Sequence, residues 1–246
     1  MNVTSAPPRT VLVTGGASGI GRAISLAYAA KGWNVLCHYR TAPDVAELAA
    51  RIEALGVACE PIRTDLADPA GVEAVTALLR ERPVDALVNN AGSYIVHRPF
   101  PELTLADLET SFRLNAFTPA LLAAAAFPGM RERGFGRIVN ISSIAAKYGG
   151  AATSLHYGMA KRALEGVTLT LGREGAAVNV LVNSVRPGVV DTAFHTRFPK
   201  DLTRRAAMIP ARRLGLAEEV ARVVAFLGSE DNTYVTRECL AVAGGE

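Results

Sequence analysis

Several features are scarce in this 246-residue chain, and each scarcity argues against a class of protein. The three cysteines, Cys37, Cys59 and Cys239, stand far apart and form no Cys-x-x-Cys pair, so the sequence supports neither a disulfide framework nor a zinc site. The four histidines are scattered without the spacing of metal ligands. Basic residues form no run and the net charge is only +3, so we expect no nucleic-acid partner.

Long apolar runs are also missing. No stretch approaches the roughly 18 uninterrupted apolar residues of a membrane helix, and the N-terminus has no apolar signal core. Cys37 and Cys59 lie in apolar, strand-like stretches, where a reduced thiol behaves as a small hydrophobe. A reducing compartment suits such thiols, so we expect a soluble, cytoplasmic protein with no membrane partner.

Apolar residues are plentiful, and they follow an alternating order. Half of the residues are hydrophobic, and short apolar runs alternate with helical patterns. This alternation predicts an α/β fold with a parallel sheet covered by helices on both faces. Without a recognisable linker, the whole chain, 1–246, is expected to form one domain, with the irregular stretch 189–216 as a substrate lid. We expect strands at 10–14, 34–39, 58–63, 84–90, 136–142, 178–185 and 238–244, and helices at 19–32, 43–56, 69–81, 105–127, 155–174 and 217–228.

A glycine-rich loop, "TGGASGIG", occupies residues 14–21 between the first strand and the first helix. Gly15, Gly19 and Gly21 follow the pattern G-x-x-x-G-x-G. Side chains here would hold a phosphate away from the backbone, whereas the helix N-terminus offers free N–H groups and a partial positive charge. The loop therefore favours dinucleotide binding, and the alternative interpretation is a flexible turn.

The end of the second strand indicates which dinucleotide would bind. An acidic residue in this region would hold the ribose 2′-hydroxyl of NAD. Here Tyr39 and Arg40 occupy the region, and no carboxylate follows until Asp44. Because a guanidinium suits a 2′-phosphate in charge and shape, we expect NADP to be preferred and NAD to be less favoured. The alternative is that Arg40 is an ordinary surface arginine.

The stretch "HYGMAK", residues 156–161, places Tyr157 and Lys161 four positions apart. Residues at this spacing share one face of a helix, so both side chains can point into one cleft. A phenol has a pKa near 10, and an adjacent ammonium would lower it toward the range of acid–base catalysis. The alternative is an exposed helical pair without a chemical role.

Six motifs in order resemble the short-chain dehydrogenase/reductase family, and the similarity covers nearly the whole chain. They are the glycine loop, "NNAG" at 89–92, Asn115, "ISS" at 141–143, the Tyr157–Lys161 pair and "RPGVVDT" at 186–192. The resemblance is nearest to the 3-oxoacyl-carrier-protein reductase-like group. It implies a Rossmann-type, doubly wound parallel sheet of about seven strands. It also implies NADP(H)-dependent interconversion of a carbonyl and a secondary alcohol, in a homotetramer.

The resemblance also assigns roles to individual residues. It implies a catalytic set of Asn115, Ser143, Tyr157 and Lys161. Ser143 and Tyr157 are 14 residues apart, about one more than the family pattern, so Ser142 stays an alternative catalytic serine. A non-catalytic NADPH sensor and an enzyme of different chemistry, such as an epimerase or dehydratase, are competing interpretations. The implied cofactor-binding residues are Gly15, Ser18, Gly19, Ile20, Gly21, Arg40, Asp65, Leu66, Asn90, Ala91, Gly92, Tyr157, Lys161, Pro187, Gly188, Val190 and Thr192.

Overall fold

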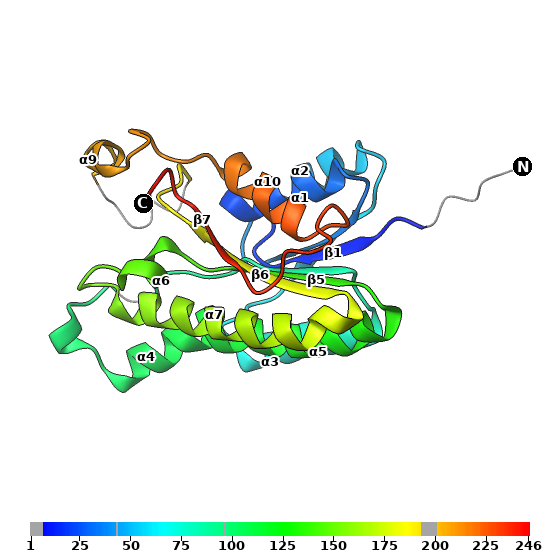
Figure 1. The fold of residues 1–246 in the computed structure, drawn as a ribbon, viewed down its shortest axis with the longest axis horizontal. Coiled ribbons are helices and arrows are strands. Elements are labelled where there is room, and N and C mark those ends of the chain that lie inside the picture. The colour runs from blue at the N-terminus through cyan, green and yellow to red at the C-terminus, as the bar shows by residue number, and fades with distance from the viewer. Residues whose placement is uncertain (1–6, 43, 96, 193–200) are drawn as a thin grey trace, which may run out of the picture.

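Seven parallel strands form one sheet in the computed structural model, which describes residues 7–42, 44–95, 97–192 and 201–246 (Figure 1). The strand order is β3-β2-β1-β4-β5-β6-β7, so the chain reverses direction across the sheet between β1 and β4. Such a reversal leaves a crevice at the carboxyl ends of the strands. The strands are β1 Thr10–Val13, β2 Asn34–Tyr39, β3 Cys59–Arg63, β4 Ala86–Asn89, β5 Gly136–Ile141, β6 Val180–Pro187 and β7 Cys239–Val242.

Helices cover both faces of this sheet, which confirms the predicted architecture (Figure 1). One face carries α1 Gly19–Ala29, α2 Val45–Glu53 and α10 Ala217–Leu227. The other carries α3 Pro69–Glu81, α4 Leu105–Phe112, α5 Thr118–Arg133 and α7 Leu155–Gly175. The described elements also include two short helices, α6 Ile144–Tyr148 and α9 Leu202–Met208, and the 3-10 turns Phe100–Glu102 and Ala176–Val178. None of the helices in these described ranges is long and apolar enough to cross a membrane.

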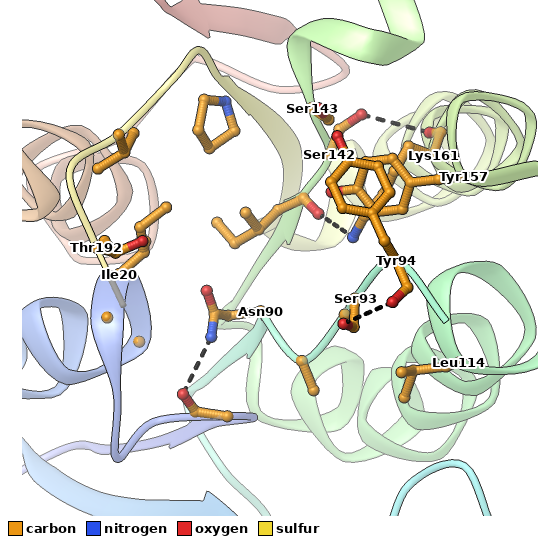
Figure 2. Close-up of a pocket in the computed structure, with 18 of the residues that line it drawn as sticks. Ile20, Asn90, Ser93, Tyr94, Leu114, Ser142, Ser143, Tyr157, Lys161 and Thr192 are labelled. Atoms are coloured by element: carbon orange, nitrogen blue, oxygen red, sulfur yellow. Dashed lines mark hydrogen bonds between the residues drawn. The ribbon is translucent and has the colours of Figure 1, made fainter. Parts of the chain in front are cut away.

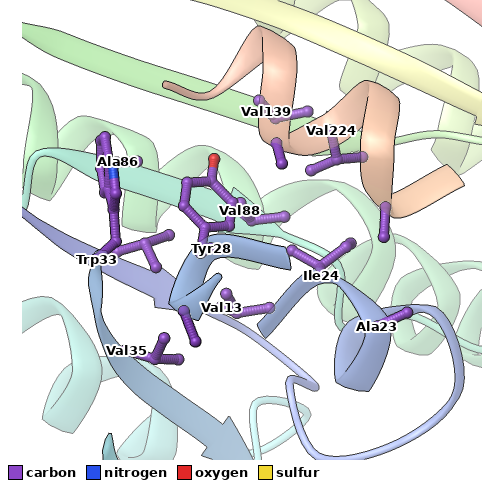
Figure 3. Packing of buried hydrophobic residues seen from close by; sticks show 14 of the residues in the cluster. Val13, Ala23, Ile24, Tyr28, Trp33, Val35, Ala86, Val88, Val139 and Val224 are labelled. Carbon is purple, nitrogen blue, oxygen red and sulfur yellow. The ribbon is translucent and has the colours of Figure 1, made fainter. Parts of the chain in front are cut away.

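The core consists of two apolar layers separated by the sheet. Successive strand residues point to opposite faces, so Val11 and Val13 pack toward α1 and α10, whereas Leu12 packs toward α3 and α5. In the first layer Val13 lies among side chains such as Ile24 and Val224 (Figure 3). Burying each such side chain stabilises the fold by about 1.5–3 kcal/mol. Burial on both faces explains why these strands are continuous apolar runs in the sequence.

The predicted helix at 105–127 differs from the observed structure. α4 ends at Phe112, a π-helical turn spans Arg113–Phe117, and α5 then continues to Arg133. Pro119 has no N–H to donate to the carbonyl of residue 115, so the regular ladder breaks at this point. The backbone N–H of Thr118 instead donates to the Arg113 carbonyl, five residues earlier. The inserted residue turns Asn115 inward, where its side chain is fully buried.

Candidate functional site

A cavity of about 840 Å³ lies at the carboxyl ends of the central strands. Every cofactor-binding residue expected from the sequence lines it, together with Ser142 and Ser143. Of the four expected catalytic residues, Asn115 alone does not line the cavity. It lies behind the cavity wall, buried beneath Gly92 and Ser93. The structure thus brings residues from across the chain, 15 to 192, into one site (Figure 2).

The glycine loop between β1 and α1 forms one end of this cavity. Gly15 and Gly19 have left-handed backbone conformations, with φ of +62° and +49°, which favour glycine. A Cβ on Gly21 would lie 2.0 Å from the Gly15 carbonyl oxygen. The Asn90 amide donates to the Thr14 and Gly15 carbonyls at 2.9 and 3.2 Å and holds the loop against β4. The fixed loop leaves the N-terminus of α1 facing the cavity, where a phosphate can bind.

His38 supports the same loop from β2, a role that the sequence analysis missed. Its Nδ1 accepts a hydrogen bond from the Gly15 N–H at 3.1 Å, and its Nε2 lies 3.1 Å from the Thr64 carbonyl oxygen. These partners require the neutral tautomer that carries its proton on Nε2. Burial lowers the pKa of His38, although the Thr64 carbonyl and the Asp65 carboxylate oppose this effect. In the sequence, this role was indicated only by a histidine inside the otherwise apolar strand "NVLCHY".

Affinity for NADPH is expected to fall at acidic pH because of His38. Protonated Nδ1 would face the Gly15 N–H, so the loop loses an acceptor. Because burial lowers the pKa of His38 in the folded protein below the ordinary histidine value of about 6.5, the ring is neutral near neutral pH, and the loop loses this acceptor only as the pH falls through the lowered value. His38→Asn keeps an acceptor that does not titrate. Fluorescence titrations of NADPH at several pH values should show a shallower pH dependence in this variant, and equal slopes would contradict the role.

Arg40 and Asp65 lie together at the side of the cavity beyond β2 and β3. The Arg40 Nη1 is 3.8 Å from the Asp65 Oδ2, and both side chains are about half exposed. Asp65 also accepts the Ala67 N–H at 2.9 Å, which fixes its turn. This end of the cavity therefore presents a guanidinium at the position where the sequence analysis expected the 2′-phosphate.

Tyr157 and Lys161 extend from α7 into the centre of the cavity (Figure 2). The Lys161 ammonium lies 5.7 Å from the centroid of the Tyr157 ring and donates to the Ile141 carbonyl at 2.7 Å. Burial lowers the pKa of Lys161 to about 8. Burial and the neighbouring Tyr94 raise the pKa of the Tyr157 phenol above its ordinary value, while a hydrogen bond with Ser143 lowers it. Desolvation is the largest of these effects, so the pKa of the phenol is raised and not lowered as the sequence analysis expected from the ammonium.

The two adjacent serines of "ISS" have different surroundings. The buried Ser142 hydroxyl donates to the Glu165 carboxylate at 2.8 Å, and its oxygen lies 3.3 Å from the Lys161 carbonyl oxygen. Ser143 instead caps α6 and hydrogen-bonds the phenol of Tyr157. Two consecutive glycines, Gly149 and Gly150, have φ of +88° and +75° in the segment that leads to Tyr157. Since the Ser142 hydroxyl is engaged with Glu165 and Ser143 contacts the phenol, the geometry favours Ser143 over Ser142 as the serine of the site.

Gly92 separates Asn115 from Lys161. A Cβ at position 92 would lie 2.8 Å from the Asn115 Oδ1 and 2.9 Å from the Lys161 Nζ, so a side chain here would displace one of the two. The Asn115 amide is oriented by the Ser93 backbone, whose N–H it accepts at 3.2 Å and whose carbonyl it contacts at 3.1 Å. It also donates to the Ser111 carbonyl at 3.0 Å. The π-helical turn thus holds a fixed amide next to the buried ammonium.

Comparisons with known proteins agree with this geometry. Residues 15–246 match the model of a family described as Enoyl-(Acyl carrier protein) reductase. The chain is 35% identical over 245 residues to the acetoacetyl-CoA reductase of Shinella zoogloeoides, covering 97% of this chain and 98% of that protein. It is also 35% identical over 243 residues to the 3-oxoacyl-[acyl-carrier-protein] reductase of Escherichia coli, covering 96% of each. The chain belongs to the short-chain dehydrogenase/reductase family.

A solved structure of a family member shows the cofactor. The 3-oxoacyl (acyl-carrier-protein) reductase of Agrobacterium tumefaciens C58, solved with NADP bound, matches with a TM-score of 0.88 and 29% identity over all of both chains. This short-chain dehydrogenase/reductase is accordingly an NADP-dependent oxidoreductase that interconverts carbonyl and hydroxyl groups. The cavity fits that cofactor in two respects. Its glycine loop has no room for a side chain at Gly21, and the Arg40 guanidinium lies at the end of β2.

The end of β6 forms the remaining wall of this short-chain dehydrogenase/reductase site. Pro187 ends the strand, and the Gly188 N–H donates to the Val242 carbonyl at 3.0 Å. Thr192 then returns to the glycine loop, with its Cγ2 3.6 Å from a Cβ placed on Gly19. Of the expected lid, 189–216, the structure describes 189–192 and 201–216, and residues 193–200 lie outside the described residues. Within α9, Arg205 forms a 2.8 Å salt bridge with Glu246 beside the cavity.

Proposed function

We propose that this enzyme reduces 3-oxoacyl thioesters to 3-hydroxyacyl thioesters with NADPH. The observation that carries the proposal is the placement of the Tyr157 phenol, which is hydrogen-bonded to Ser143 and lies beside buried Lys161 in the same cavity as the glycine loop. The substrate class is supported by the two relatives, one named for acetoacetyl-CoA and the other for 3-oxoacyl-carrier-protein. The segment 189–216 would act as a lid over this substrate.

NADPH would supply the hydride that adds to the carbonyl carbon of the substrate. Tyr157 donates its phenolic proton to the carbonyl oxygen, so the sum of hydride and proton gives a secondary alcohol and NADP⁺. Ser143 hydrogen-bonds the same oxygen and stabilises its developing negative charge. Lys161 places a buried cation near the phenol and favours loss of that proton. Asn115 orients the backbone around this cation and belongs to the route by which a proton returns to Tyr157.

The remaining expected contacts would hold NADP. The pyrophosphate would bind at the N-terminus of α1, against Gly15, Ser18, Gly19, Ile20 and Gly21. The ribose and adenine would lie against the walls at the ends of β3 and β4, formed by Asp65, Leu66, Asn90, Ala91 and Gly92. The nicotinamide end would lie against Pro187, Gly188, Val190 and Thr192.

Arg40→Ala is expected to weaken NADPH binding more than NADH binding. The guanidinium at the end of β2 would lose its charge-assisted contact with the 2′-phosphate, which NADH lacks. The loss is expected to be about 10-fold or more in the NADPH/NADH ratio of kcat/KM, because such contacts contribute about 1.5–3 kcal/mol. Steady-state kinetics with both cofactors measures this. Arg222→Ala, on α10, is a charge-matched control, and an unchanged ratio in Arg40→Ala would refute the assignment.

The direct test of function is NADPH oxidation against a substrate panel. Acetoacetyl-CoA represents 3-oxoacyl thioesters, crotonyl-CoA represents enoyl thioesters, and diketones and keto sugars represent other carbonyls. Turnover with acetoacetyl-CoA and little with crotonyl-CoA supports the proposal. Faster turnover of crotonyl-CoA would favour the chemistry for which the matching family is described. Saturable NADPH binding without turnover of any substrate would favour the sensor interpretation.

We propose further that the enzyme works as a homotetramer in the cytoplasm. Apolar side chains are exposed along α4, the π-helical turn and α5, where Leu105, Phe117 and Leu121 are 71%, 55% and 53% exposed. Leu169 on α7 is 43% exposed. Burying these side chains between copies would stabilise an assembly. Size-exclusion chromatography with light scattering should give four times the mass of the chain, and a clean monomer would refute the assembly.

A further inference from the structure

One buried carboxylate, Glu165, accepts hydrogen bonds from three different side chains. Its Oε1 accepts from the Ser142 hydroxyl at 2.8 Å and from the Arg186 Nε at 2.6 Å. Its Oε2 accepts from the Arg186 Nη2 at 2.7 Å and from the Arg162 Nη1 at 3.0 Å. Burial raises the pKa of Glu165, but the hydrogen bonds from Arg186, Ser142 and Arg162 outweigh burial and leave it below its ordinary value. The carboxylate is therefore charged and fully engaged.

Each partner of this carboxylate is adjacent to a residue of the site. Ser142 directly precedes Ser143 at the end of β5, and Arg186 directly precedes Pro187 in β6. Glu165 itself follows Lys161 by one turn of α7 and lies on the same face. The Ser142 hydroxyl also contacts the Lys161 carbonyl, and its N–H donates to the Val185 carbonyl at 2.8 Å. One anion thus joins the ends of β5, α7 and β6 at the level of the cavity.

A second polar cluster joins the same three elements one turn further from the cavity. The Thr168 hydroxyl on α7 accepts from the Asn140 amide of β5 at 2.8 Å and shares a 2.7 Å hydrogen bond with the Ser184 hydroxyl of β6. All three side chains are fully buried. The fold therefore has a tie between β5, α7 and β6 that does not involve Glu165. What distinguishes Glu165 is its position next to Ser143, Lys161 and Pro187.

We propose that Glu165 is a positioning residue that fixes the placement of Ser143 and Lys161 relative to the nicotinamide-facing end of β6. The inference rests on the proposed function, because it assigns those three segments to catalysis and cofactor binding. A buried, bidentate arginine–carboxylate pair is rigid, and it holds the ends of β5 and β6 at a fixed distance from α7. Small displacements of such groups have large effects on rate, since a shift of about 1 Å can cost about 100-fold.

The test compares Glu165→Gln with Thr168→Val. Glutamine keeps the shape but places an N–H₂ group against the donors, so at least one contact is lost. We expect kcat with acetoacetyl-CoA to fall about 10–100-fold in Glu165→Gln, with the Kd for NADPH nearly unchanged. Thr168→Val should lower the urea midpoint to a similar extent but leave kcat within about twofold, because its tie lies away from the reacting groups. A merely structural role of Glu165 would give both variants the same behaviour.

Two further measurements keep the outcomes separate. The fluorescence of bound NADPH needs no substrate, and we expect Glu165→Gln, but not Thr168→Val, to change its emission. If Glu165→Gln does not fold, Ser142→Ala removes a single hydrogen bond and is expected to show a smaller change in the same direction. A wild-type enzyme that reduces no substrate would refute the proposed function. Full kcat or unchanged NADPH emission in folded Glu165→Gln would overturn the positioning role.

Discussion

Tyr157→Phe is expected to lower kcat with acetoacetyl-CoA by about 10²–10⁴-fold, the usual contribution of a positioned general acid. The Tyr157 phenol contacts Ser143 and lies beside Lys161, and the proposed proton donor is lost when its oxygen is removed. The phenylalanine ring keeps the packing against Tyr94, whose centroid is 4.3 Å away. Stopped-flow or steady-state NADPH oxidation measures the loss of rate.

Cofactor binding should survive the same substitution. The glycine loop and Arg40 are contributed by other elements and are unchanged, so the Kd for NADPH is expected to stay within about threefold, less than 1 kcal/mol. Tyr234→Phe is a matched control, because Tyr234 is 95% exposed and loses the same hydroxyl group. Retained activity in Tyr157→Phe, or equal losses in both variants, would show that the phenol does not donate the proton.

Gly21→Ala is expected to abolish NADPH binding and to destabilise the fold. A Cβ at this position would lie 2.0 Å from the Gly15 carbonyl oxygen and 2.6 Å from the Asn90 amide nitrogen. Since the clash is with backbone, the loop itself must move, and overpacking of this kind costs about 1–3 kcal/mol. The displaced loop would no longer present the N-terminus of α1 to the pyrophosphate. Urea unfolding and NADPH fluorescence titration measure the two effects.

Gly166→Ala provides the control for this substitution. Gly166 lies on the exposed side of α7, and a Cβ there has no atom within 4 Å among the residues that the structure describes, apart from its own helix. Alanine in a helix interior is favoured over glycine by about 1 kcal/mol, so this variant should be as stable as wild type or more stable. NADPH binding by Gly21→Ala at the wild-type level would contradict the role of the loop.

Local sequence signals predicted those parts of the fold that depend on neighbours in the chain. Asp68 accepts the Ala70 N–H as an N-cap and Pro69 occupies the first turn, so α3 begins where the sequence indicated. β3 contains Pro61 and lies at the edge of the sheet, the position where a strand tolerates a residue without an N–H. The break between α4 and α5 was not predicted, because a single inserted residue barely changes the helical periodicity.

The polar contacts of the site could be predicted only in part. Tyr157 and Lys161 meet because helical spacing alone places them on one face. His38 and Glu165 were missed, since their partners Gly15 and Arg186 lie 23 and 21 residues away and only the assembled sheet brings them together. The choice between Ser142 and Ser143 likewise required the orientation of the end of β5. Sequence motifs predicted the candidate reacting groups, and the structure added residues that contact them.

Transfer of deuterium from labelled NADPH to acetoacetyl-CoA tests the central claim most directly. NADPH deuterated at C4 on either face would be used in two separate reactions, with mass spectrometry of the product. We expect one of the two labels to appear at C3 of 3-hydroxybutyryl-CoA with the wild-type enzyme, and about 10²–10⁴-fold more slowly with Tyr157→Phe. Tight NADPH binding without label in the product from either face would contradict the assignment of this chain as a 3-oxoacyl thioester reductase.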